Sequence, residues 1–163
     1  MNPTFAIEGA KLVSARDVPV GSLFCLVREK RVCGLCMRVR FEKTQLFLSL
    51  DGDHRFNLDE IASTHYGLQV EAGSLRFRLG DPRTDESEEP EEGLLIISET
   101  GAFMTVRLDG LGNTYQILLL NLSDGILQRE YPPAYCALEN WQMISRAANG
   151  GEKLLFAAGT MPD

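Results

Sequence analysis

The sequence predicts a mainly β fold, an antiparallel barrel or sandwich of about ten short strands with one late helix. Three observations predict it. Apolar and polar residues alternate along most of the chain, which is the period of a strand with one buried face. Turn signals such as Asp51-Gly52, Thr100-Gly101 and Asp124-Gly125 separate these segments. The 163 residues, 44% of them hydrophobic, are enough to bury a core.

The first half alternates clearly enough to place its strands. We expect them at residues 22–28, 31–41, 45–50 with a continuation at 56–58, 68–71 and 74–79. The last two are predicted to form a hairpin across Ala72-Gly73. In the segment 31–41, Met37 and Val39 share an inward face, while Arg38 and Arg40 share the opposite face.

The second half repeats the strand pattern and then changes character. Strands are expected at residues 94–98, 102–108, 115–122, 126–131 and 153–158. The segment 115–122 is apolar on both faces, which favours a central strand. Residues 134–148 follow Pro132-Pro133 and contain many good helix formers, so we predict a helix there. The competing interpretation is a strand with Tyr135, Ala137, Glu139 and Trp141 on one face.

An acidic segment divides the chain. Residues 81–92, DPRTDESEEPEE, hold seven acidic residues and one arginine, which is −6 of the net charge of −7. We expect a single β-rich domain, 1–163, with halves 5–80 and 93–159 joined by this acidic linker. Residues 37–42 (MRVRFE) resemble 104–109 (MTVRLD), and 45–50 (QLFLSL) resemble 116–122 (QILLLNL). A duplicated β-meander explains this likeness, and so does the general similarity of amphipathic hairpins.

Composition and charge exclude several classes of protein. A pI near 4.9 makes nucleic acid an unlikely partner, because phosphate binding needs a basic surface. No apolar run approaches the roughly 20 residues that span a bilayer, so no membrane partner is expected. The N-terminus has no basic start followed by an apolar stretch, and four cysteines make no disulfide scaffold. These features predict a soluble, cytoplasmic protein.

Two motifs could hold a metal, and neither is complete. Cys33 and Cys36 form a CxxC, but residues three apart on a regular strand point to opposite faces unless Gly34 makes a bulge. No second CxxC exists, only Cys25 and Cys136, so structural thiols are the better interpretation. The run Asp51-Gly52-Asp53-His54, with Asp59 and Glu60 after it, departs from a calcium loop after its second Asp, and a turn explains it. We therefore predict no metal and no cofactor.

Catalytic motifs are missing from the sequence. The two histidines, His54 and His65, bracket an irregular stretch, and no GxSxG, HExxH or phosphate-binding glycine motif is present. We assign no catalytic residue, and an enzyme is not the favoured class.

Arginines on the outward faces are the candidate binding residues. They are Arg38, Arg40, Arg76, Arg78 and Arg107. If their strands are neighbours, these side chains make a basic stripe that suits carboxylate or phosphate groups, including a partner's acidic surface or the acidic segment itself. The alternative is an ordinary charged outer face whose arginines pair with Glu.

The sequence favours a non-catalytic binding or assembly module whose partner is an unknown protein or a second copy. The second class is a β-rich enzyme with a site built from His54, His65 and acidic loop residues, or placed between subunits. The third is a barrel that binds a small ligand, which needs an interior wider than side chains can fill.

Overall fold

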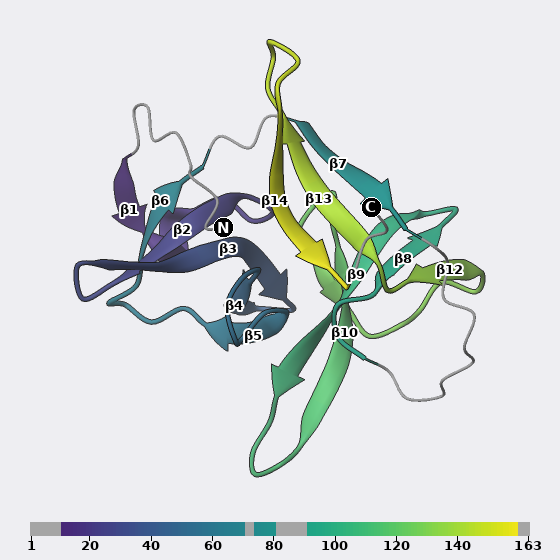
Figure 1. Cartoon of the computed structure of the whole chain (residues 1–163). Coiled ribbons are helices and arrows are strands. Elements are labelled where there is room, and N and C mark those ends of the chain that lie inside the picture. Colours follow the sequence, from purple (N-terminus) through teal and green to yellow (C-terminus); the bar gives the residue numbers. More distant parts are fainter. Residues whose placement is uncertain (1–10, 71–73, 81–90, 160–163) are drawn as a thin grey trace.

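The computed structural model describes residues 11–70, 74–80 and 91–159, and over these residues the protein is mainly β, as predicted (Figure 1). The strands of the first half are β1 (Leu12–Ser14), β2 (Leu23–Arg28), β3 (Arg31–Phe41), β4 (Thr44–Ser49), β5 (Asn57–Glu60), β6 (Tyr66–Gln69) and β7 (Ser74–Leu79). Those of the second half are β8 (Leu95–Ser98), β9 (Gly101–Asp109), β10 (Tyr115–Asn121), β11 (Leu127–Gln128), β12 (Tyr135–Leu138), β13 (Trp141–Arg146) and β14 (Glu152–Ala158). A short 3₁₀ turn, η1 (Ala15–Asp17), follows β1.

The strands form two open sheets. The larger sheet has the order β1-β6-β2-β3-β4-β5-β9-β10-β11, and β8 joins β12 to β9. The smaller sheet has the order β14-β13-β7. Within the described part of the chain neither sheet closes into a barrel, so the barrel alternative of the prediction is wrong, and the sandwich alternative stays a prediction. The larger sheet branches at β9, whose first residues pair with β8 while Arg107 and Leu108 pair with β5.

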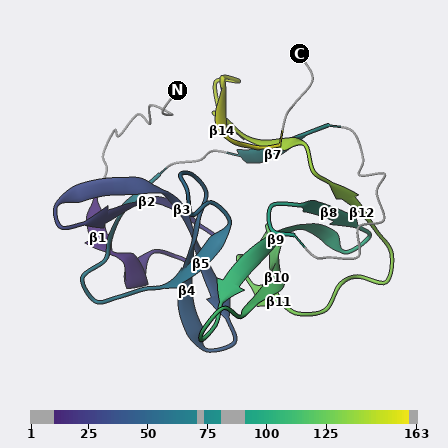
Figure 2. The ribbon, with the colours of Figure 1, turned by 60° about the horizontal axis from the view of Figure 1, so that its bottom comes forward.

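Two parallel contacts join the halves of the larger sheet in the described residues. Among the named strands all pairs are antiparallel except β5 with β9, where Asn57 and Leu58 lie opposite Arg107 and Leu108. Arg40 of β3 also forms an isolated parallel bridge with Ile126. Figure 2 shows β1 to β5 on one side of this junction and β8 to β12 on the other, with β7 and β14 of the smaller sheet above them. The strands β5 and β9 therefore bring the ends of two hairpins, β3–β4 and β9–β10, to one place.

The two halves share one hydrogen-bond pattern. Met37 lies between Leu23 and Leu48 in the first half, as Met104 lies between Leu95 and Leu120 in the second. Gly21 and Gly93 start the two patterns with φ angles of 87° and 88°. The equivalent positions are Gly21 and Gly93, Leu23 and Leu95, Gly34 and Gly101, Met37 and Met104, Arg38 and Thr105, Arg40 and Arg107, Leu48 and Leu120, Phe56 and Gly125, and Leu58 and Leu127.

The last segment of each half forms a backbone hydrogen bond with the other half. The Arg107 N–H donates to the Phe56 carbonyl at 2.9 Å, and the Arg40 N–H donates to the Gly125 carbonyl at 3.0 Å. Phe56 and Gly125 both have positive φ angles, 68° and 74°. This reciprocal pairing is what a duplicated β-meander would produce. Duplication of the sequence itself stays a prediction.

Residues 134–148 form β12 and β13 instead of the predicted helix. Every residue of β13 lies between a β7 partner and a β14 partner, so its backbone bonds belong to a sheet. The side chain of Trp141 is fully buried, and its Nε1 donates to the Gly93 carbonyl at 2.9 Å. Helix propensity is a weak preference, and this tertiary pairing overrides it.

The predicted hairpin between residues 68–71 and 74–79 is also wrong. The strand β6 pairs with β1 and β2 in the larger sheet, whereas β7 pairs with β13 in the smaller one. The chain therefore changes sheets after β6. Most of the acidic segment, residues 81–90, lies outside the described residues, so its predicted linker role stays a prediction.

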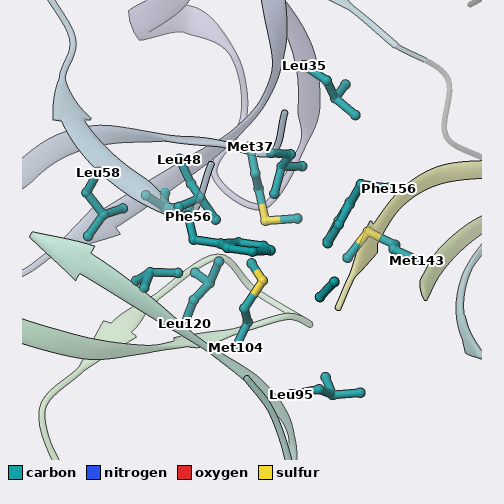
Figure 3. Close-up of a cluster of buried hydrophobic side chains, with 14 of the residues drawn as sticks. Leu35, Met37, Leu48, Phe56, Leu58, Leu95, Met104, Leu120, Met143 and Phe156 are labelled. Carbon is teal, nitrogen blue, oxygen red and sulfur yellow. The ribbon is translucent and has the colours of Figure 1, made fainter. Parts of the chain in front are cut away.

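The main core draws side chains from both sheets. Met37, Met104 and Met143 extend into it together with Phe56 and Phe156 (Figure 3). The Phe156 ring lies edge-on to Trp141, with 5.1 Å between ring centroids, which ties β13 to β14. The described residues contain no helix long and apolar enough to cross a membrane.

Candidate functional site

Arg38 is buried, which corrects its predicted outward position. Its side chain is 2% exposed. A second apolar cluster that includes Phe24 and Phe47 covers this face of β3. Its Nη1 donates to the carbonyls of Val39 at 2.8 Å and Leu46 at 3.1 Å, while its Nε has no partner. Burial, and then the nearby charge of Arg40, lowers the pKa of the Arg38 guanidinium.

The other predicted arginines are exposed or half-buried, and their strands belong to different sheets. Arg40 lies on β3 and Arg107 on β9, whereas Arg76 and Arg78 lie on β7 of the smaller sheet. Because β3 and β7 do not pair, the two groups form no stripe across neighbouring strands. Arg78 is 3.7 Å from the Glu152 carboxylate, which fits the alternative of an ordinary paired face. Anion binding by these arginines stays a prediction.

The CxxC has the bulge that its geometry requires. Leu26 pairs with Gly34 and Val27 pairs with Val32, so Cys33 is the extra residue. Cys33 and Cys36 consequently line one hollow of 370 Å³ instead of facing apart. The remaining lining residues of this hollow are Leu26, Arg28, Phe47, Ser49, Asp51, Gly52, Asp53, His54 and Asp59.

Burial suppresses ionisation of the Cys36 thiol in this hollow. Burial, and then the Asp51 carboxylate, raises the pKa of Cys36 to about 12, so its thiol stays protonated near neutral pH. The Asp51 carboxylate itself accepts a hydrogen bond from the Leu35 N–H at 3.0 Å. No group of three or more His, Cys, Asp and Glu side chains in the described part of the chain could hold a metal ion. Cys36 therefore carries little thiolate near neutral pH.

The two histidines do different things. His65 lies edge-on to the Phe47 ring, with 5.6 Å between centroids, and its Nδ1 accepts from the Ala62 N–H at 3.1 Å. Burial, and then the charge of Arg28, lowers the pKa of His65, so this ring serves the packing of its loop. His54 is exposed, and it lines both the 370 Å³ hollow and a larger groove beside it.

The larger groove has a volume of 690 Å³ and lies where β5 and β9 join the two halves. Its lining residues come from the end of the β3–β4 hairpin, from β5 and from the β9–β10 hairpin. They are Phe41, Glu42, Thr44, Leu46, His54, Asn57, Leu58, Asp59, Glu60, Leu108, Asp109, Gly110 and Gln116. We call this feature the acidic groove.

The floor of the acidic groove is the end of the main core. Leu46 and Leu58 are buried core members, and Phe41 and Leu108 are half-buried side chains that pack against them. The floor is preformed because these side chains are held by the register of β4 with β5 and of β5 with β9. It offers an apolar surface to whatever enters the groove.

The rim carries the charge. Four carboxylates, from Glu42, Asp59, Glu60 and Asp109, line the groove, and among the described residues no Lys or Arg lines it. Arg129 approaches Glu42 from outside at 2.9 Å, and Arg107 approaches Asp109 at 2.7 Å. Over the described residues the side-chain carboxylates of Asp59 and Glu60 make no hydrogen bond or salt bridge. The Glu60 carboxylate shares the face of β5 that carries Leu58, whereas Asp59 lies on the opposite face, where its charge acts on His65.

This combination suits a cation with an aliphatic stem. The stems of Lys and Arg cover apolar surface while their charged ends stay at the rim, where carboxylates neutralise them. Sequence reasoning missed the groove. The equivalence of residues 37–42 with 104–109 was the available signal, because Glu42 and Asp109 end the two repeats. Their convergence depends on the parallel β5–β9 pair, which alternation does not encode.

Comparisons with known proteins add no functional assignment. No family model, no curated protein and no solved structure matches the chain.

Proposed function

We propose that the protein is a soluble, cytoplasmic and non-catalytic binding module that holds a basic segment of a partner protein in the acidic groove. One observation carries the proposal: four carboxylates surround the apolar floor, and no lysine or arginine is among the lining residues. The net charge of −7 adds an attraction that steers basic partners toward the chain.

The size of the groove fits one or two long side chains. Its 690 Å³ falls within the range of roughly 300–1,000 Å³ that is typical of binding pockets. Asp59 and Glu60 are consecutive on β5 and point to opposite faces of the strand, so a cation that lies above Leu58 meets the Glu60 carboxylate. A ligand that buries its stem against Leu58 and Leu108 also removes apolar surface from water.

A peptide titration tests the proposal. The probe is a short fluorescein-labelled peptide in which arginine alternates with leucine, and binding is followed by fluorescence anisotropy. We expect saturable binding that weakens between about 0.05 M and about 0.5 M NaCl, since salt screens exposed charges. The double variant Asp59→Asn/Glu60→Gln should bind the peptide about three- to tenfold more weakly.

A matched double variant controls for net charge. Asp17→Asn/Glu99→Gln also removes two exposed carboxylates, and both lie outside the lining of the groove. Its affinity for the peptide should stay within about twofold of the wild-type value. If both double variants weaken binding equally, the peptide responds to net charge and the groove is not the site. Absence of saturable binding at either salt concentration would also refute the proposal.

A further inference from the structure

We infer that the acidic groove recognises arginine in preference to lysine, and that Arg129 of this chain holds the guanidinium position until an arginine of the partner displaces it. This inference rests on the proposed function, because it names the cation that the same groove accepts. According to this inference, Phe41 and Glu42 determine the preference for arginine, and Arg129 competes with the partner's arginine for the same position.

Arg129 shows what the end of the groove binds. It follows β11, and its Nη1 lies 2.9 Å from the Glu42 carboxylate. Its Cζ lies 4.7 Å from the centroid of the Phe41 ring. Phe41 and Glu42 line the groove and Arg129 does not, so a ring face and a carboxylate together hold this guanidinium at the outer edge of the groove.

The opposite wall repeats this arrangement. Arg107 donates from Nε to the Asp109 carboxylate at 2.7 Å, and its Cζ lies 4.2 Å from the centroid of the Tyr115 ring. Asp109 ends β9 directly after Leu108, as Glu42 follows Phe41 at the end of β3. Both hairpins that form the groove therefore place a carboxylate beside a ring-stacked guanidinium.

Geometry separates arginine from lysine at such a place. A planar guanidinium can lie over a ring and still donate in its own plane to a carboxylate. An ammonium is a compact, strongly hydrated charge and cannot keep both contacts as well. The paired ring and carboxylate thus favour arginine, whereas Asp59 and Glu60 attract either cation.

Displacement of Arg129 is feasible because its ion pair is exposed. The side chains of Arg129 and Glu42 are 60% and 64% exposed. Exposed ion pairs of this kind are weak, since water and salt compete with them. A partner arginine that also buries its stem in the groove can therefore replace Arg129, which can then turn outward without unfolding any strand.

Two peptides that differ only in arginine or lysine test the inference. The arginine–leucine peptide should bind the wild-type chain about two- to fivefold more tightly than its lysine–leucine counterpart. Phe41→Leu should remove this preference, so that the two peptides bind the variant with affinities within about twofold of each other. Arg129→Gln should raise the affinity for the arginine peptide about two- to fivefold, because the internal competitor is gone.

Arg78→Gln is the matched control for Arg129→Gln. It also removes an exposed arginine from an ion pair, but on β7 of the smaller sheet. It should leave the preference for arginine unchanged and raise the affinity less than Arg129→Gln does. Equal increases in the two variants would show an effect of net charge and refute the role of Arg129.

The outcomes separate this inference from the proposed function. If the lysine peptide binds as tightly as the arginine peptide, and Asp59→Asn/Glu60→Gln weakens both, the groove binds cations and the inference is wrong. If neither peptide binds, the proposed function and the inference both fail. If circular dichroism shows that Phe41→Leu is unfolded, two other results still test the inference. They are the preference of the wild-type chain for the arginine peptide and the comparison of Arg129→Gln with Arg78→Gln.

Discussion

Arg38 lies on the face of β3 that strict alternation assigns to solvent, yet it is buried beside Phe24 and Phe47. Alternation correctly placed Met37 and Val39 in the core of this strand. It could not reveal that a second apolar cluster, partly from η1 and its surroundings, covers the opposite face. A period-2 pattern identifies two faces of a strand but not how many of them are covered.

Replacing Arg38 with Met should change the free energy of unfolding by no more than about 1 kcal/mol. Met keeps most of the buried aliphatic volume and removes the Nε that has no partner. Arg38→Ala should lose about 2–4 kcal/mol, because it leaves a cavity. Urea unfolding followed by the fluorescence of Trp141, the single tryptophan, measures both. A loss above about 3 kcal/mol in Arg38→Met would show that the guanidinium bonds to Val39 and Leu46 dominate.

Cys36 makes stability depend on pH in the alkaline range. Its pKa is raised from 9.0 to about 12 in the folded chain, so between these values the unfolded state loses a proton that the folded state keeps. Stability should therefore fall as pH rises above 9.0, by up to about 1.4 kcal/mol per pH unit. Cys36→Ala should show a shallower fall in urea unfolding at pH values between 9 and 11. Identical slopes in the two proteins would contradict the burial of this thiol.

At the scale of elements, most strands were predictable and their partners were not. The segments 31–41 and 153–158 match β3 and nearly match β14, because their alternation is strong. The helix at 134–148 and the hairpin joining β6 to β7 were wrong for a common reason: β7 and β13 meet in the smaller sheet. That pairing joins residues 62 to 72 positions apart, and neither local propensity nor turn chemistry indicates such a contact.

Replacement of Trp141 tests the packing of the smaller sheet. Trp141 is fully buried between Phe77 and Phe156, and its Nε1 donates to the Gly93 carbonyl, so it joins β13 to the segment that leads into β8. Trp141→Phe should cost about 2–4 kcal/mol, from the cavity and the unpaired carbonyl. Urea unfolding followed by circular dichroism measures the loss. The control Tyr135→Phe, on an exposed ring of β12, should change stability by less than about 0.5 kcal/mol. A Trp141→Phe variant as stable as the control would contradict the packing described for β13.

At the scale of the whole molecule, the groove exists because two similar halves meet. Glu42 follows β3 and Asp109 ends β9, and the parallel pair of β5 with β9 brings both residues to the acidic groove. The sequence shows both residues and the likeness of their surroundings. It does not show that the halves exchange their last segments, so the acidic groove could not be placed before the structure.

The predicted arginine stripe failed at the same scale. It required β3 and β7 to be neighbours, and these strands belong to different sheets. The negative surface that the structure assembles instead comes from residues spread over β3, β5 and β9, none of which belongs to the acidic segment 81–92.

The most direct test of the acidic groove is a nuclear magnetic resonance titration of the ¹⁵N-labelled chain with the arginine–leucine peptide. The largest amide shifts should fall on β5, on the end of the β3–β4 hairpin around Phe41 and Glu42, and on the start of the β9–β10 loop around Asp109. The amide shifts of β7 and β14 should not exceed the variation between spectra of the chain without peptide. Shifts concentrated on the smaller sheet, or no localised shifts at a peptide concentration that saturates anisotropy, would contradict a binding function for this groove.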